Sequence, residues 1–200
     1  MKTIHLLSAC LPCFLIAPAQ AKGLLGETYI TGSFDSGSVE EVDAWGLSFG
    51  YNKPIAQDRE YSYDFNLSAY FAELDEAGID ADGKGLEAGL VVFPNKEMEV
   101  RPFIAAHVGY GELAAFGLSD DSFLYRVSVG GEWQASERVV LTPTVSYFDY
   151  TELADGDDVT VGVSGSFWID DHNNVGLGFE RTSRSGLHAD VVSVTYRFAY

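Results

Sequence analysis

The stretch from Tyr61 to Ala72 reads YSYDFNLSAYFA, and its polarity alternates from residue to residue. Its polar positions are Ser62, Asp64, Asn66 and Ser68, and its apolar positions are Tyr61, Tyr63, Phe65, Leu67, Ala69 and Phe71. A period of two is typical of a β-strand, because successive side chains point to opposite faces. The stretch is long for a strand of a soluble sheet and close to the roughly 9 to 11 residues that a tilted strand needs to cross a membrane. It therefore predicts a membrane-spanning strand.

The same alternation recurs along the chain. With the first stretch included, the expected strands are residues 26–34, 44–52, 61–72, 85–93, 100–111, 123–134, 139–150, 159–169, 175–182 and 190–200. Short turns and longer acidic loops alternate between them, as in outer-membrane barrels with short periplasmic turns and long extracellular loops. We predict an all-β fold, an antiparallel up-and-down transmembrane β-barrel with ten strands, or with eight as the alternative. An even number of strands places both termini on one side, expected to be the periplasmic side.

Residues 1–21 have the features of a secretory signal peptide. Lys2 supplies a positive charge, the run from Ile4 to Ile16 is largely apolar, and Ala19-Gln20-Ala21 is a small-x-small cleavage site. An alternative processing site, Leu7-Ser8-Ala9-Cys10, resembles a lipobox but leaves almost no apolar region before the cysteine. We predict cleavage after Ala21 and a barrel domain over residues 22–200.

Composition excludes several classes of function. Both cysteines, Cys10 and Cys13, lie in the predicted signal peptide, so the mature chain can form neither a disulfide nor a thiolate metal site. The formal net charge of −18 argues against nucleic acid as a partner, because phosphate binding needs clustered Lys and Arg.

Aromatic residues on the outward face are expected in two bands. The band near the periplasmic rim comprises Tyr61, Tyr63, Trp133, Phe167, Phe198 and Tyr200, and the band near the outer rim comprises Trp45, Phe71, Tyr110, Phe123 and Tyr147. Such girdles mark the two interfaces of a membrane-spanning barrel.

With these features the chain resembles the small Gram-negative outer-membrane β-barrel proteins, the group that includes OmpA-type, opacity-type and porin-like barrels. The resemblance is carried by the signal peptide, the strand at 100–111 (VRPFIAAHVGYG) and the closing strand at 191–200 with its terminal aromatic residue. It implies a bacterial outer-membrane location, contact with lipid and lipopolysaccharide, and recognition by the barrel assembly machinery. Tyr196, Phe198 and Tyr200 would supply the assembly signal.

Small residues dominate the inward positions, and a few charged or titratable residues interrupt them. These candidate lumen residues are Glu27, Asp64, Glu87, Arg101, His107, Arg126, Glu132, Glu180 and Arg197. We predict two ion pairs, Arg101 with Glu132 and Arg197 with Glu27, since an interior charge needs a partner or water. Such pairs could line a narrow pore or rigidify a filled barrel.

Enzymatic activity is not expected. Asp80-Ala81-Asp82 and His188-Ala189-Asp190 are superficially similar to the paired motifs of the ten-stranded omptin proteases, but the second motif runs in reverse order. His107 is followed by Val108-Gly109, so the His-x-Ser motif of lipid A deacylases is missing. We predict no catalytic residue, no cofactor and no metal site. The acidic loop 155–158 has Ca²⁺-type oxygen ligands but lacks EF-hand spacing.

The sequence favours a monomeric outer-membrane barrel with a structural or narrow-pore role. The alternatives are a surface adhesin or receptor that acts through its acidic loops and, less favoured, an omptin-like protease.

Overall fold

The computed structural model describes residues 23, 25–39, 42–76, 79–96, 98–115, 118–151, 158–184 and 187–200. The predicted signal peptide, its cleavage site and most of the acidic loop at 151–158 lie outside these residues. Among the described residues, no helix is long and apolar enough to cross a membrane.

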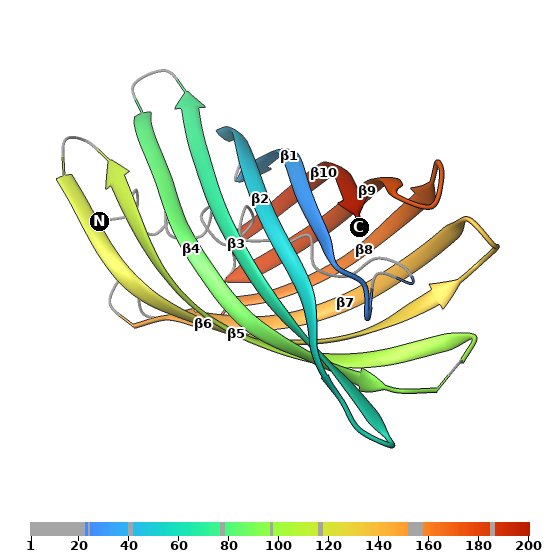
Figure 1. Cartoon of the computed structure of the whole chain (residues 1–200). Helices are drawn as coiled ribbons and strands as arrows, with labels where there is room; N and C mark the ends of the chain where they lie inside the picture. The colour runs from blue at the N-terminus through green and yellow to red at the C-terminus, as the bar shows by residue number, and fades with distance from the viewer. Residues whose placement is uncertain are drawn as a thin grey trace.

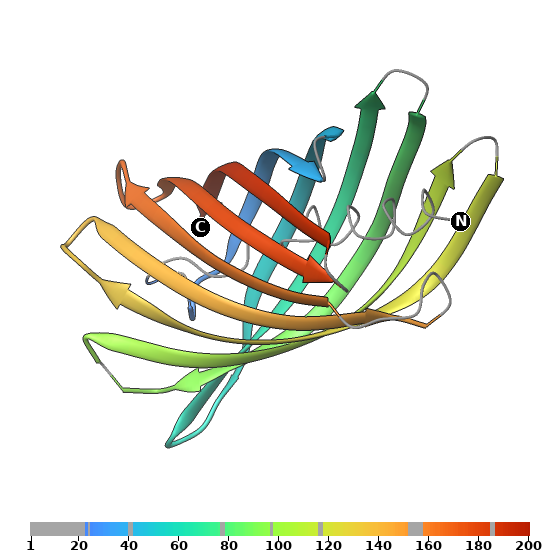
Figure 2. The same ribbon diagram turned by 180° about the vertical axis from the view of Figure 1, so that it is seen from behind.

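Ten antiparallel strands form a closed barrel (Figure 1). They are β1 (Tyr29–Val39), β2 (Val42–Gln57), β3 (Tyr61–Glu76), β4 (Ile79–Pro94), β5 (Val100–Ala115), β6 (Leu118–Gln134), β7 (Val139–Tyr150), β8 (Asp158–Trp168), β9 (Asn173–Arg184) and β10 (Leu187–Ala199). Each strand pairs with its neighbours in sequence, and β1 closes the barrel against β10 from Tyr29↔Ala199 to Val39↔Ala189. Figure 2 shows this closure from behind. The predicted ten-stranded barrel is confirmed, and the eight-stranded alternative is wrong.

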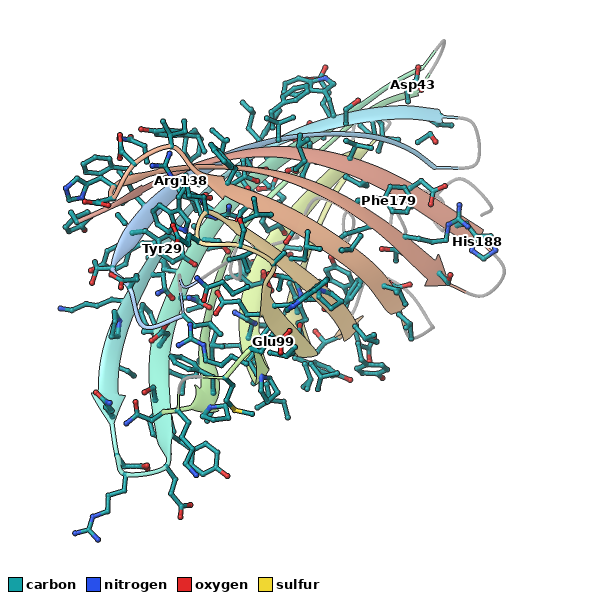
Figure 3. The ribbon with its side chains drawn as sticks, turned by 90° about the vertical axis from the view of Figure 1, so that its right-hand side faces the viewer. Tyr29, Asp43, Glu99, Arg138, Phe179 and His188 are labelled. Carbon is teal, nitrogen blue, oxygen red and sulfur yellow. The ribbon has the colours of Figure 1, made fainter. Side chains whose placement is uncertain are left out.

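The two ends of the barrel carry different connections. The turns β2–β3, β4–β5, β6–β7 and β8–β9 lie at the same end as the start of β1 and the end of β10, which is the periplasmic end in the predicted orientation. The other connections lie at the outer end. In Figure 3, Asp43 and His188 lie near the outer end and Arg138 lies at the opposite end.

The strands are longer at the outer end than the sequence suggested. Strands β2 to β6 have 16 or 17 residues, and only residues 40–41, 77–78, 116–117 and 185–186 separate the strands of four outer hairpins. Much of the predicted acidic loops is therefore strand. There the alternation continues with reversed polarity: Leu74 and Ala81 face inward and are buried, whereas Glu73 and Asp82 lie opposite each other on the outward face. Outside the bilayer the outward face meets water, so charged residues are stable there.

Apolar side chains cover the middle of the outward face. Phe49, Leu86, Val108 and Leu177 are each at least 60 % exposed, as expected where the surrounding medium is hydrocarbon. Members of the predicted outer aromatic band also meet in pairs: the ring centroids of Trp45 and Phe71 are 5.7 Å apart, and those of Tyr110 and Phe123 are 5.2 Å apart. Tyr110 and Phe123 stand directly opposite each other on β5 and β6, whereas Trp45 and Phe71 are diagonal neighbours on β2 and β3.

Two aspartates organise periplasmic turns. Asp58 Oδ1 accepts hydrogen bonds from the backbone N–H groups of Tyr61 (2.7 Å) and Glu60 (2.8 Å). Asp170 Oδ1 accepts from the N–H groups of His172 and Asn173, both at 2.8 Å. These hydrogen bonds favour the charged carboxylate and lower the pKa of each aspartate below its ordinary value of 3.8.

A lowered pKa predicts an acid-sensitive contribution to stability. The stabilisation by Asp170 is fully present above pH 3.8, the pKa of the unfolded chain, and is lost as the pH falls through the lower folded-state pKa. An Asp170→Ala variant should therefore unfold at a lower urea concentration than the natural chain at pH 7, and the difference should shrink below pH 3.8. A difference that stayed constant from pH 7 to pH 2.5 would contradict this assignment.

Candidate functional site in the barrel lumen

Large inward side chains lie against the barrel wall, because glycines on neighbouring strands leave room for them. The Tyr70 ring from β3 lies over Gly85 of β4, and its hydroxyl reaches Gly111 of β5. Glu180 of β9 covers Gly162 of β8, where an added Cβ would lie 2.5 Å from Glu180 Cγ. These side chains therefore pack directly on the backbone of the neighbouring strands.

His107 occupies a similar groove over Gly89. An added Cβ at Gly89 would lie 2.5 Å from both the Ala106 carbonyl oxygen and His107 Cγ. The Ala106 carbonyl oxygen belongs to the backbone and cannot move aside as a flexible side chain can. We therefore expect Gly89→Ala to cost about 1–3 kcal/mol of unfolding free energy, the usual cost of overpacking. The control is Gly32→Ala, whose Cβ would meet nothing closer than the Phe49 ring at 3.8 Å. Urea unfolding in lipid vesicles measures both, and equal losses would contradict the close fit.

Arg126 on β6 is the centre of the charged cluster in the middle of the lumen. Its Nη2 donates to Glu87 Oε1 on β4 at 3.0 Å, and the two side chains are 9 % and 1 % exposed. Its guanidinium also lies 5.9 Å from the centre of the Phe148 ring. His107 is buried and stands directly opposite Arg126 in the register of β5 and β6. The sequence named Arg126, Glu87 and His107 separately, and the structure brings them together.

The predicted Arg101–Glu132 ion pair is present near the periplasmic mouth. Arg101 Nη2 lies 2.6 Å from Glu132 Oε2, and its Nε donates to the same oxygen at 3.2 Å. The Arg101 guanidinium also lies 5.1 Å from the centre of the Phe93 ring.

The chain just before β1 enters this mouth, which the sequence did not reveal. Leu25 is 6 % exposed and packs in a cluster with Val91, Phe93, Phe103 and Ala105.

Three polar side chains form hydrogen bonds with the backbone of residues 25–27. Arg101 donates to the Leu25 carbonyl at 3.2 Å, the Gly26 N–H donates to Asp64 at 2.8 Å, and Asn52 donates to the Glu27 carbonyl at 2.6 Å. We call residues 25–28 the mouth segment; Gly26 turns it at φ +90°.

A cavity of about 910 Å³ opens beside the mouth segment. Leu25, Phe93, Met98, Arg101 and Glu132 are among its lining residues, so it has both apolar and charged walls. This cavity forms a periplasmic vestibule.

The second predicted pair takes a different form. Glu27 is exposed and precedes β1, so it does not stand on the lumen face of a strand. Arg197 is 3 % exposed and donates from Nη1 to Asn174 Oδ1 at 2.9 Å. The prediction missed this arrangement because the first strand starts at Tyr29 and not at Gly26.

The two protease-like motifs are not brought together. Ala81 and Ala189 are buried on the inward face, so Asp82 lies on the outward face of β4, and His188 and Asp190 lie on the outward face of β10. Three strands, β1 to β3, separate these two strands around the barrel. Asp190 instead binds Arg181 through two contacts of 2.6 Å, and the Asp80 side chain lies outside the described part. The described residues contain no group of three or more His, Cys, Asp or Glu suited to a metal ion.

No protein-family model and no curated protein sequence matches this chain. Solved structures do match it. The translocator domain of the autotransporter NalP from Neisseria meningitidis has a TM-score of 0.52 at 8 % identity, over 100 % of this chain and 95 % of that one. The β domain of the Bordetella autotransporter BrkA has a TM-score of 0.53 at 10 % identity, over 88 % of this chain and 100 % of that one.

The chain has the fold of a small outer-membrane β-barrel. A third barrel, the COG4313 outer membrane channel from Pseudomonas putida F1, has a TM-score of 0.50 at 6 % identity, over 92 % of this chain and 100 % of that one. At these identities the likeness extends to the fold of an outer-membrane barrel alone.

The aromatic residues at the end of the chain lie on the outer surface of the barrel. Tyr196 and Phe198 lie on the outward face of β10, and Tyr200 follows the strand and is 65 % exposed. The backbone N–H of Tyr200 donates to the Thr28 carbonyl at 3.1 Å, so the last residue is fixed to the start of β1.

Proposed function

We propose that this chain is an integral outer-membrane barrel that provides a narrow path for small solutes and prefers cations. The observation that carries the proposal is the charge of the inward face. The inward carboxylates of the described strands are Asp35, Asp64, Glu87, Glu132, Asp158 and Glu180, and the inward guanidinium groups are Arg101, Arg126 and Arg197. Rings of carboxylates favour cations in a pore.

The packing of the lumen supports a path of small diameter. Side chains such as Tyr70 and Glu180 lie along the wall over glycines. The mouth segment narrows the periplasmic end, and the adjacent vestibule of about 910 Å³ gives solutes access from that side.

Other features suit a membrane-embedded role more than surface recognition. Four of the outer connections leave only two residues between strands, which gives an adhesin little loop surface. We expect lipid and lipopolysaccharide to surround the outward face, the β10 aromatics to act as the assembly signal, and the barrel to work as a monomer.

Planar-bilayer recording of the refolded mature chain tests this function. We expect discrete conductance steps, and under a KCl gradient a reversal potential of the sign given by K⁺ preference. The control is a Glu180→Gln variant, which should keep the steps and reduce the cation preference. A barrel that is folded but silent would overturn the pore and leave a structural role, and anion preference would overturn the assignment of the lumen charge.

A further inference from the structure

Two carboxylates of the lumen, Asp35 on β1 and Glu180 on β9, face inward without a cationic partner. Asp35 is 1 % exposed; its Oδ1 accepts from Ser33 Oγ at 2.9 Å, and its Oδ2 has no hydrogen-bond partner. Glu180 makes no ion pair with any described residue. It stands opposite Val191 of β10, which in turn stands opposite Gly37 of β1, two residues from Asp35. An interior carboxylate is unstable unless a cation or hydrogen bonds satisfy it, so this pair is suited to receive a positive charge.

Arg126 does not meet this need. Arg126 acts on Glu180 electrostatically, but its Nη2 is bound to Glu87 at 3.0 Å. The described residues therefore place no cation in contact with either carboxyl group of the pair.

An aliphatic surface adjoins the carboxylate pair on the side of the outer end. The register runs from Glu180 to Val191, Gly37, Ala44, Leu74 and Ala81 across the strands β9, β10, β1, β2, β3 and β4. We call the buried inward aliphatic residues of this region the apolar wall; they are Val42, Ala44, Ala72, Leu74, Ala81, Ala189 and Val191. A water-filled lumen has no need of such a surface, whereas ligand sites typically combine apolar lining with a few placed polar groups.

We propose that the apolar wall and the Asp35–Glu180 pair bind a small amphipathic organic cation, with the hydrocarbon body on the wall and the positive charge at the carboxylates. This proposal rests on the proposed function for access to the lumen, and it names the class of solute.

The chemistry favours an organic over an inorganic cation. Hard cations such as Ca²⁺ take 6 to 8 oxygen ligands, and Mg²⁺ keeps much of its water. The described residues offer no group of three or more acidic or histidine side chains suited to a metal ion. A substituted ammonium ion needs fewer oxygen contacts, and burial of its carbon skeleton against the apolar wall also favours binding.

Isothermal titration of the mature barrel in lipid nanodiscs with benzyltrimethylammonium chloride tests the site. We expect saturable binding to the natural chain, and weaker binding of tetramethylammonium, which lacks the aromatic body, and of benzenesulfonate, which has the opposite charge. Asp35→Asn combined with Glu180→Gln should weaken benzyltrimethylammonium binding about tenfold or more. Leu74→Ser should weaken it while leaving tetramethylammonium binding unchanged.

The matched control is Glu112→Gln, which removes one negative charge from the outward face, where Glu112 pairs with Lys84 at 3.1 Å. It should bind benzyltrimethylammonium as the natural chain does. The heat-dependent gel shift of folded barrels verifies each variant, and Glu180→Gln alone replaces the double variant if the latter does not fold. Equal affinity of the natural chain and the lumen variants would overturn the site.

Conductance separates this inference from the proposed function. A barrel that conducts K⁺ but does not bind benzyltrimethylammonium would overturn the organic-cation site and leave the pore intact. A silent barrel that binds it with the expected dependence on Asp35 and Glu180 would support the site and overturn the pore.

Discussion

An Arg126→Met variant is expected to lose about 3–5 kcal/mol of unfolding free energy, because it leaves the buried Glu87 carboxylate without its cation. The two atoms of the pair are 3.0 Å apart, and the side chains are 9 % and 1 % exposed. Reversible urea unfolding in lipid vesicles, followed by tryptophan fluorescence, measures the loss.

The exposed pair of Arg181 and Asp190 provides the contrast. It is closer, at 2.6 Å, but its side chains are 57 % and 38 % exposed, so solvent screens it. Arg181→Met should therefore lower the unfolding free energy far less than Arg126→Met does. The double variant Glu87→Met/Arg126→Met should recover most of the stability lost by Arg126→Met alone, since no buried charge remains from the pair. Similar losses for Arg126→Met and Arg181→Met would show that the central pair is not desolvated.

Deletion of residues 22–27 is expected to raise single-channel conductance about twofold or more, because the mouth segment occupies part of the periplasmic opening and pore width controls conduction. The deletion removes Leu25 from its apolar cluster and three hydrogen bonds to the backbone of residues 25–27. Strand β1 begins at Tyr29, so the pairing that closes the barrel is kept.

Point variants refine the experiment. Leu25→Ser should raise the frequency of long open events without removing the segment, since it weakens the apolar contact with Phe93 and Phe103. Gly23→Ala is the matched control, because an added Cβ there meets nothing within 4 Å. Unchanged conductance in both the deletion and Leu25→Ser would show that the mouth segment does not restrict the path.

The strand count and the direction of most side chains could be predicted from alternation alone. Within the bilayer the outward face meets hydrocarbon, so a segment such as 159–164 alternates between apolar outward residues and small or polar inward residues. The Arg101–Glu132 pair could also be predicted, because both residues lie opposite each other on adjacent strands.

The outer strand ends could not be predicted by the same rule. Asp82 and Glu73 have the composition of a loop, yet they are outward residues of continuous strands. The reversed pattern, with Leu74 and Ala81 inward, was the available signal. This reversed alternation is easily missed because it extends over only a few residues. A short alternating segment next to acidic residues is equally compatible with a turn. The apolar wall was missed for the same reason.

The mouth segment could not be predicted because its position depends on contacts between residues distant in sequence. Gly26 donates to Asp64, and the Leu25 carbonyl accepts from Arg101, 76 positions along the chain. Alternation says nothing about such contacts. The exposed position of Glu27 follows from the turn at Gly26, which removes Glu27 from the predicted pair with Arg197.

The seam between β1 and β10 has a consequence for biogenesis. Its first pair joins Tyr29 to Ala199, so nearly the whole polypeptide must be delivered before the ring can be completed. Until then, the edges of both strands expose unpaired N–H and C=O groups, and such edges readily pair with foreign strands. Contacts between residues so distant in sequence also form slowly. The two edges of the unfinished ring must therefore be kept from foreign strands until the whole polypeptide has been delivered.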